Sequence, residues 1–213
     1  MSKLHAIFPE QGIRAAIPEA AFTSFGMKDL SSIVRLKSLA LFELGLTTWH
    51  AAMMSRQFRV APNALGDLVD RKEPNLLKYV SRALNRKVLF DISYRFATDP
   101  STEASPPKLQ LLVAHTYPNR LHIADIQLLD PRKPKAGAGA DDDQSHESLR
   151  LLGVTLENAK TVAREIGADQ ITLTAANREL VPVFARHGFT VERSLAAQQA
   201  VAMDAGVPMQ LDL

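Results

Sequence analysis

One carboxylate on a strand face is the residue of this sequence best suited to proton transfer. The alternation of residues 121–129 predicts a β-strand. It places four residues on the face of Asp125: Leu121, Ile123, Gln127 and Leu129. A carboxylate on a mostly apolar face suits removal of a proton from an amine near neutral pH, so Asp125 is the candidate general base. The competing interpretations are a carboxylate at the sheet surface or one paired with a neighbouring arginine.

Other catalytic chemistry has little support in the residue pattern. The sequence contains no cysteine, which excludes a disulfide framework, a thiolate zinc site and a cysteine nucleophile. Its six histidines show neither His-x-x-x-His nor HExxH spacing, so we expect no metal site. No G-x-S-x-G motif occurs, so a serine nucleophile elbow is not indicated.

Hydrophobic periodicity predicts the elements that position Asp125. Apolar residues at helical spacing predict three helices in the first part of the chain, over 30–44, 47–56 and 74–85, with Gly45 ending the first. Alternation predicts three strands with short links, most simply an antiparallel meander, over 88–96, 109–117 and 121–129. The rest predicts helix, strand, helix, strand and a last candidate strand, over 149–166, 171–175, 178–187, 188–195 and 207–213.

The second half of the chain carries a set of landmarks at fixed spacing. In order they are Ala163, Gly167, the apolar strand 171–175, Asn177, Phe184, Gly188 and Phe189. This arrangement resembles the signature of the GCN5-related N-acetyltransferase (GNAT) family. The likeness spans residues 149–195, and the order of the strands extends it back to Val88. It implies an α+β fold, with a GNAT-like mixed and mainly antiparallel sheet flanked by helices.

The resemblance also implies a function, the transfer of an acetyl group from acetyl-CoA to an amine. In the family, Arg/Gln-x-x-Gly-x-Gly/Ala at the start of the long helix binds the pyrophosphate, and a splayed strand binds the pantetheine arm. The helix register places this motif over residues 148–153. The implied cofactor-binding residues are Ser148, Arg150, Leu151, Leu152, Gly153, Asn177 and Phe184.

The sequence departs from the family pattern at several of these positions. Leu151 stands where glycine allows close approach to phosphate, and Ser148 replaces the usual Arg or Gln. Phe184 occupies the position of a tyrosine that can protonate the leaving thiolate. Arg150 is a charge within the motif that could compensate. Two functions remain open: an N-acetyltransferase with an unknown acceptor, and a non-catalytic scaffold that binds a protein, or less plausibly nucleic acid.

The resemblance and the composition together suggest two parts. We expect a helical N-terminal segment over 1–70 and a GNAT-like acyltransferase domain over 71–213. Residues 130–147 have no apolar side chain larger than alanine or proline and predict a mobile surface loop. The apolar stretch from Leu36 to Leu46 contains Lys37 and Glu43 and is shorter than the roughly 20 residues of a membrane span. Without a secretory signal at its start, the chain is expected to be cytoplasmic.

Charge and surface patterns limit the partners. A formal net charge of +2 is too balanced to indicate a polyanion ligand by itself. Lys78, Arg82 and Arg86 are spaced four apart and predict a basic stripe on one helix, but no aromatic side chains interleave it, which disfavours nucleic acid. The helix over 30–44 is apolar on more than one face, so it is a possible homodimer surface.

Overall fold

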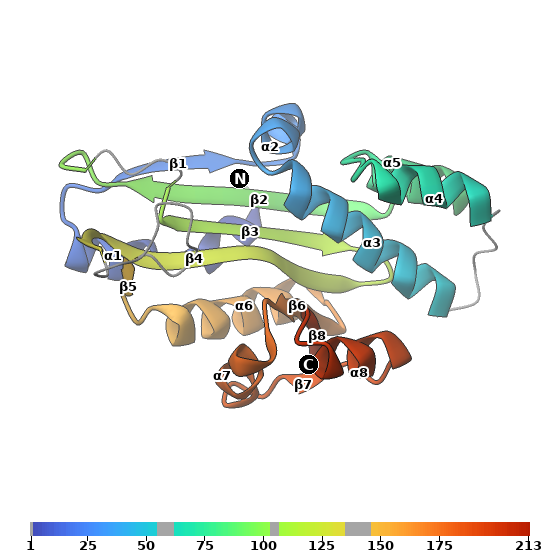
Figure 1. Cartoon of the computed structure of the whole chain (residues 1–213). Helices are drawn as coiled ribbons and strands as arrows, with labels where there is room; N and C mark the ends of the chain where they lie inside the picture. Colours follow the sequence, from blue (N-terminus) through green and yellow to red (C-terminus); the bar gives the residue numbers. More distant parts are fainter. Residues whose placement is uncertain (1, 55–61, 103–106, 135–145) are drawn as a thin grey trace.

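A mixed sheet of eight strands organises the chain, in a computed structural model that describes residues 2–54, 62–102, 107–134 and 146–213 (side chains of 62–65 excepted). The strands follow the order β1-β2-β3-β4-β6-β8-β7 (Figure 1). They are β1 (Ala21–Phe25), β2 (Leu89–Thr98), β3 (Leu109–Thr116), β4 (Arg120–Pro134), β6 (Gln170–Ala175), β8 (Val207–Asp212) and β7 (Thr190–Val191). The short strand β5 (His146–Ser148) pairs with β4 off this path. The meander predicted for β2, β3 and β4 is confirmed.

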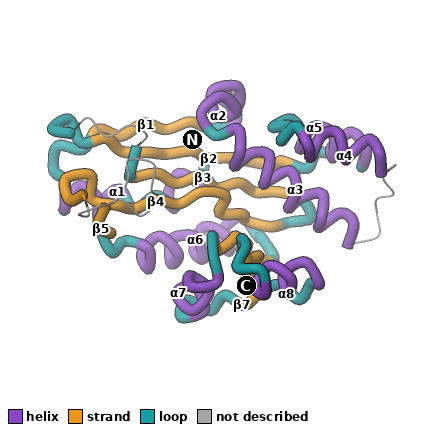
Figure 2. The backbone as a smooth tube through the Cα atoms, in the orientation of Figure 1, coloured by secondary structure: helices purple, strands orange, loops and turns teal. Residues whose placement is uncertain are grey.

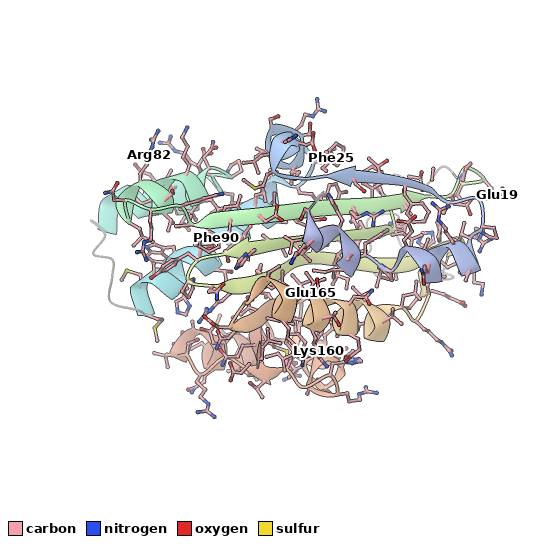
Figure 3. All side chains as sticks on the ribbon, turned by 180° about the vertical axis from the view of Figure 1, so that it is seen from behind. Glu19, Phe25, Arg82, Phe90, Lys160 and Glu165 are labelled. Atoms are coloured by element: carbon pink, nitrogen blue, oxygen red, sulfur yellow. The ribbon has the colours of Figure 1, made fainter. Side chains whose placement is uncertain are left out.

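Helices cover both faces of the sheet, as predicted for the α+β class. The face seen in Figures 1 and 2 carries α2 (Leu30–Leu36), α3 (Ser38–Met54), α4 (Pro62–Asp70) and α5 (Leu76–Ala83). The opposite face, seen in Figure 3, carries the 3₁₀ helix η1 (Lys3–Ile7), α1 (Glu10–Ala16) and α6 (Leu152–Ile166). The remaining helical segments are η2 (Met27–Asp29), η3 (Arg178–Leu180), α7 (Val181–Ala185) and α8 (Leu195–Ala202). Each face thus has its own hydrophobic core.

The N-terminal segment is part of this sheet. The sequence predicts residues 1–70 as helical, but β1 lies within them and pairs antiparallel with β2. Leu4, Ile7 and Ile13 are fully buried in the core shared with α6. The buried guanidinium of Arg95 also connects β2 to the N-terminal segment, because it donates hydrogen bonds to Glu10 Oε2 at 2.6 Å and to the His5 carbonyl at 3.0 Å. Residues far apart in sequence therefore build one core.

The predicted helix over 30–44 is two helices. The chain leaves helical geometry at Lys37 (φ −135°, ψ 41°), between α2 and α3. The prediction that Gly45 ends a helix is wrong, because Gly45 lies inside α3. A Cβ at Gly45 would come within 2.8 Å of Leu76 Cβ, so glycine allows α3 and α5 to pack closely. Beyond the break, α3 crosses the sheet over β2, β3 and β4 (Figure 1).

The second half follows its predicted order with two differences. Helix α6 ends as predicted at Gly167, which has the left-handed φ of 69° that favours glycine. The strand predicted over 188–195 is only β7, and α8 follows it. Of the predicted loop, residues 130–134 extend β4 and 146–147 belong to β5, while 135–145 lie outside the described residues. Within the described ranges, no helix is long and apolar enough to cross a bilayer.

The basic stripe is shorter than predicted. Helix α5 ends at Ala83, so only Lys78 and Arg82 lie on it. The Arg86 guanidinium instead lies 5.5 Å from the ring centroid of Tyr117. A continuous row of three cations on one helix is therefore absent from α5.

Candidate functional site

The gap between two parallel strands is the most distinctive feature of the sheet. β4 and β6 pair in parallel from Arg120–Gln170 to Ile123–Leu173, and the ladder between them ends there among the described residues. Beyond that rung, β4 pairs with β5, as at Leu129–Ser148, while β6 stays paired with β8 up to Ala175. The two strands therefore separate beyond this rung, and we call this separation the parting; β3 lies on the outer side of β4, and β8 lies on the outer side of β6. Their facing edges offer peptide groups to an extended ligand.

A β-bulge lies in β4 directly beside this parting. Val113 of β3 pairs with Ile123, but Leu112 pairs with Asp125, so Ala124 is an extra residue in β4. The bulge reverses the alternation that the sequence predicted. Asp125 lies on the side of Leu112, in the core under α3, whereas Ile123 belongs to the core under α6. The prediction that Asp125 shares a face with Leu121 and Ile123 is therefore wrong.

The Asp125 carboxylate is paired with an ammonium group. Lys37 Nζ lies 2.6 Å from Asp125 Oδ2, and the side chains are 14% and 22% exposed. The same ammonium lies 5.3 Å from the ring centroid of Tyr94. The sequence left open a pairing of Asp125 with a neighbouring arginine, but the partner observed is a lysine 88 positions away. This contact links the α2–α3 break to the strand bulge.

Further polar groups line the face around Asp125. The Tyr94 hydroxyl donates to Gln110 Oε1 at 2.9 Å, and Gln110 Nε2 donates to Gln127 Oε1 at 2.8 Å. Burial, and then the charge of Asp125, raise the pKa of the Tyr94 phenol, so Tyr94 is a neutral donor here. Polar side chains on a mostly apolar face are typical of a binding site.

Glu43 of α3 is a second carboxylate near Asp125. Although the residue is exposed as a whole, partial desolvation of its carboxyl group raises its pKa, and the Asp125 charge raises it further. Our sequence reasoning missed Lys37 and Glu43 as site residues. The signal was present, since both are charges inside the most apolar stretch of the chain.

A buried histidine lies at the closed end of the parting. His122 and Thr172 face each other across the parallel ladder, and His122 Nδ1 lies 2.9 Å from Thr172 Oγ1. Burial, with a smaller effect of Arg120, lowers the pKa of His122 to about 4. The imidazole is therefore neutral in the folded chain near neutral pH. The His122–Thr172 pair directly precedes Ile123–Leu173, the last pair between β4 and β6.

The predicted phosphate-binding residues form the turn from β5 into α6. Ser148 pairs with Leu129, and its hydroxyl accepts a hydrogen bond from the Arg150 backbone N–H at 3.1 Å. Arg150 is exposed and has a left-handed φ of 58°. Leu151 is the N-cap of α6 and forms no side-chain capping bond. The N-terminus of α6 therefore carries the positive end of the helix dipole, and no side chain at the N-cap accepts a hydrogen bond from its first-turn N–H groups.

Leu151, which replaces a glycine of the family's phosphate-binding motif, packs against the hydrophobic core. A Cβ on Gly12 would lie 2.6 Å from Leu151 Cδ2, so the leucine side chain lies directly against α1. Leu151 and Leu152 are partly buried against the core under α6. Gly153 keeps the next position small, where a Cβ would approach His187 Cε1 to 3.4 Å. The backbone of this turn, with Arg150, fits an anionic phosphate group.

The remaining predicted cofactor residues have structural roles. Asn177 caps η3, because its Oδ1 accepts the Leu180 N–H at 3.2 Å. Phe184 is 7% exposed, and its ring packs edge-on against Phe189 with centroids 6.2 Å apart. Both residues hold the segment that follows β6. The capping role is the interpretation that sequence reasoning weighed against a cofactor contact for Asn177.

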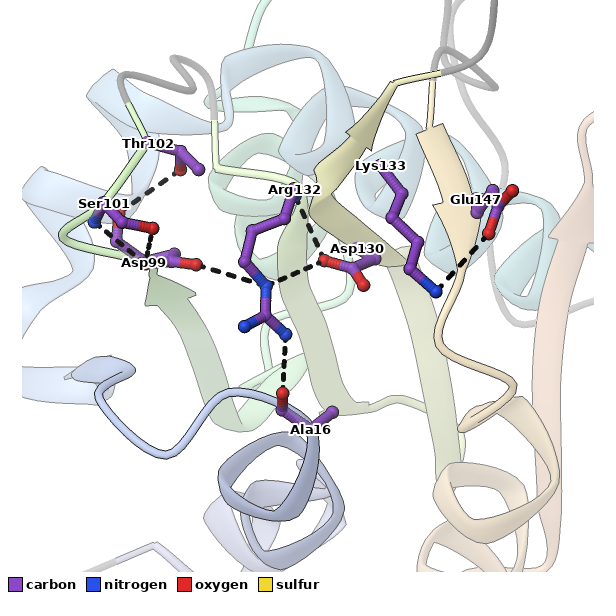
Figure 4. A network of polar contacts seen from close by, with 8 residues as sticks. All are labelled: Ala16, Asp99, Ser101, Thr102, Asp130, Arg132, Lys133 and Glu147. Atoms are coloured by element: carbon purple, nitrogen blue, oxygen red, sulfur yellow. Dashed lines mark hydrogen bonds and ion pairs between the residues drawn. The ribbon is translucent and has the colours of Figure 1, made fainter.

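A separate cavity of about 190 Å³ lies at the far ends of β2 and β4. It is next to Arg132, whose guanidinium donates to the Ala16 carbonyl at 2.6 Å and pairs with Asp99 and Asp130 (Figure 4). The hydrogen bonds from Ser101 lower the pKa of Asp99. The two carboxylates thus more than balance the charge of the one guanidinium, and the Arg132 bond to Ala16 anchors α1 to the strand ends. Among the described side chains, no group of three could hold a metal ion.

Comparisons with known proteins find similar solved structures. No family model matches the chain, and a search of curated proteins finds no significant match. Nourseothricin acetyltransferase aligns with 19% identity and a TM-score of 0.34, over 57% of this chain and 65% of its own. The chain thus spans just under two thirds of that protein.

Two further structures carry acetyltransferase names. A Bacillus subtilis acetyltransferase in complex with CoA aligns with 16% identity and a TM-score of 0.35, over 64% of this chain and 83% of its own. A putative acetyltransferase of the GNAT family from Desulfovibrio desulfuricans aligns with 14% identity and a TM-score of 0.35, over 91% and 98%. This chain is similar, at low identity, to acetyltransferases of the GNAT family.

Proposed function

We propose that the chain is an acetyl-CoA-dependent N-acyltransferase that transfers an acetyl group to an amine. The observation that carries this proposal is the parting of β4 and β6 beyond Ile123–Leu173, with the uncapped start of α6 beside it. A ligand with a pyrophosphate and a long amide-containing arm suits such a place. The helix start favours the anion, and the strand edges offer peptide partners to the arm.

Residues at the start of α6 are the proposed binding site for the pyrophosphate of acetyl-CoA. The first-turn N–H groups of α6, at Leu152 and Gly153, would hold the pyrophosphate together with the Arg150 guanidinium. Leu151 would contribute its backbone only, because its side chain lies against Gly12. Asn177 and Phe184 enter the proposal as supports of the segment after β6 rather than as side-chain donors to the ligand.

Asp125 is the proposed base. When bound, acetyl-CoA supplies an activated acetyl thioester. Asp125 lies just beyond the last β4–β6 rung and would take a proton from the acceptor amine. An acceptor ammonium would replace Lys37 at this carboxylate, since both groups offer the same charge. Glu43 nearby adds a second carboxylate, which favours a cationic acceptor over an anionic one.

The proposal is tested by an acceptor screen with thiol detection. The full chain is incubated with acetyl-CoA and a set of primary amines, and release of the CoA thiol is followed for each. We expect at least one cationic amine to raise thiol release in proportion to enzyme concentration, and acidic amines to give none. A screen in which no amine raises release above hydrolysis, although acetyl-CoA binds, would contradict the transferase.

One observation favours the second candidate, a non-catalytic scaffold that binds a protein. Leu36 and Leu39, on either side of the α2–α3 break, are 49% and 52% exposed. An exposed apolar pair of this kind suits a protein partner or a second copy of the chain. Sedimentation of the chain against its Leu36→Lys/Leu39→Lys variant tests self-association. A scaffold that forms dimers predicts loss of the dimer in the variant, whereas identical sedimentation contradicts it.

A further inference from the structure

Lys37 is an amine already held at the proposed catalytic carboxylate. We infer that Lys37 is itself an acetylation site, modified from acetyl-CoA by the same chain with Asp125 as base. The inference rests on the proposed function and adds a covalent modification to it. Its chemistry is that of any primary amine acceptor, with the acceptor supplied by the protein.

The position of the Lys37 ammonium carries the inference. Its Nζ lies 2.6 Å from Asp125 Oδ2 and 5.3 Å from the Tyr94 ring centroid, and the side chain is only 14% exposed. Asp125 in turn follows Ile123, the last β4–β6 rung, by two residues. The amine therefore lies at the edge of the parting, on the face under α3. An amine held beside a base gains from proximity relative to lysines in solution.

The backbone explains why this lysine reaches the sheet. Lys37 is the residue at which α2 ends, and its N–H donates to the Ile33 carbonyl at 2.8 Å. Its own carbonyl accepts the Leu41 N–H at 3.0 Å at the start of α3. The break thus fixes the Lys37 backbone on both sides. The side chain then extends toward β4 with its ammonium against Asp125.

Lys160 provides a matched comparison within the same chain. Its Nζ is also 2.6 Å from a carboxylate, Glu157 Oε1, and its side chain is 17% exposed. It lies on α6, on the opposite face of the sheet (Figure 3). The two lysine side chains are therefore similarly exposed and equally close to a carboxylate, although Glu157 is 65% exposed and Asp125 only 22%. Of the two lysines, Lys37 is the one beside the parting.

The proposed step balances without any further reactant. Asp125 takes a proton from the Lys37 ammonium, and the neutral nitrogen attacks the thioester carbonyl carbon. The C–N bond of an amide forms, the C–S bond breaks, and the CoA thiolate takes up a proton as it leaves. The product is Nε-acetyl-Lys37, which no longer carries a positive charge for the pair with Asp125.

Site-resolved labelling tests this inference. The full chain is incubated with isotopically labelled acetyl-CoA, which distinguishes new acetyl groups from those acquired during expression, and peptides are quantified by mass spectrometry. We expect label at Lys37 to appear at least roughly tenfold faster than at Lys160. Asp125→Asn should slow labelling of Lys37 by about a hundredfold and leave that of Lys160 unchanged. Equal rates at both lysines would overturn the inference.

A binding readout separates this inference from the proposed function. Without acetyl-CoA, limiting acetic anhydride labels each lysine according to the accessibility and protonation of its amine, and added desulfo-CoA, which has no thiol to react with the anhydride, should protect Lys37 but not Lys160. Calorimetry on the same preparation reports whether CoA binds. If CoA binds, but acetyl-CoA does not label Lys37 and desulfo-CoA does not protect it, the modification is overturned while the transferase stands. If CoA does not bind, both are overturned.

Discussion

Ile123 and Leu173 form the last rung of the parallel pairing between β4 and β6, and the two strands part from there. On one side of this rung the bulge at Ala124 places Asp125 under α3. The turn into α6, which ends β5, lies along the β4 side of the same parting. The candidate base and the candidate phosphate site thus both lie beside the separation of β4 and β6 that begins at Ile123–Leu173.

The exposed Arg150 should contribute charge to the phosphate site. We predict that Arg150→Gln weakens acetyl-CoA binding by about tenfold and lowers the dependence of Kd on salt, because one charge-assisted contact is lost. Calorimetric titration at two salt concentrations measures both effects. Arg164→Gln, at the other end of the same helix, is the matched control. An Arg150→Gln Kd equal to that of the control would show that Arg150 does not contact the ligand.

Asp125 should act in turnover rather than in cofactor binding. Asp125→Asn keeps the size of the side chain and removes the base, so kcat should fall by about 10²–10⁴ while acetyl-CoA affinity changes little. The exposed Asp169, which directly precedes the start of β6 and lies away from the parting, provides the control Asp169→Asn. If both variants turn over like the parent chain, Asp125 is not the base.

The close packing at Gly45 predicts a large effect of a single methyl group. Gly45→Ala should destabilise the chain by about 1–3 kcal/mol, because the new Cβ meets Leu76 at 2.8 Å. Gly66→Ala in α4 is the control, since a Cβ there meets nothing within 4 Å. That change should stabilise by up to about 1 kcal/mol. Urea unfolding gives both values, and equal effects would contradict the α3–α5 packing.

The buried His122 should make stability depend on pH. Its folded pKa of about 4 lies below the ordinary value of 6.5, so between these values the unfolded chain binds a proton that the folded chain does not. The free energy of unfolding should therefore decrease as the pH falls from 6.5 toward 4. The contribution is about 3 kcal/mol in total.

Replacing His122 isolates this contribution. His122→Asn keeps a polar group near Thr172 but cannot take up the proton, so its stability curve should be flatter over this pH range. Urea midpoints at a series of pH values measure the difference between the two chains. Parallel curves for His122→Asn and the parent would contradict a buried neutral imidazole.

The sequence predicted most elements because their signals are local. The meander of β2 to β4 follows from alternation within each strand, and the end of α6 follows from Gly167. The bulge at Ala124 left no such signal, because one extra residue in an alternating strand does not change its composition. It was the bulge that reversed the face expected for Asp125.

The site contacts were beyond sequence reasoning for a different reason. Lys37 and Asp125 are 88 positions apart, and neither residue type specifies its partner. The packing of Leu151 against Gly12 likewise joins distant segments, so Leu151 was understood only as the loss of a glycine. Contacts of this kind depend on how the elements assemble, which periodicity within one element cannot report.

The most direct test of the acyltransferase proposal is calorimetric titration of the full chain with acetyl-CoA, with free CoA alongside. The parting of β4 and β6 with the start of α6 predicts binding tighter than roughly 100 μM, which corresponds to about 5.5 kcal/mol. Absence of heat and of any thermal shift at millimolar ligand would contradict a cofactor site between Ile123–Leu173 and α6.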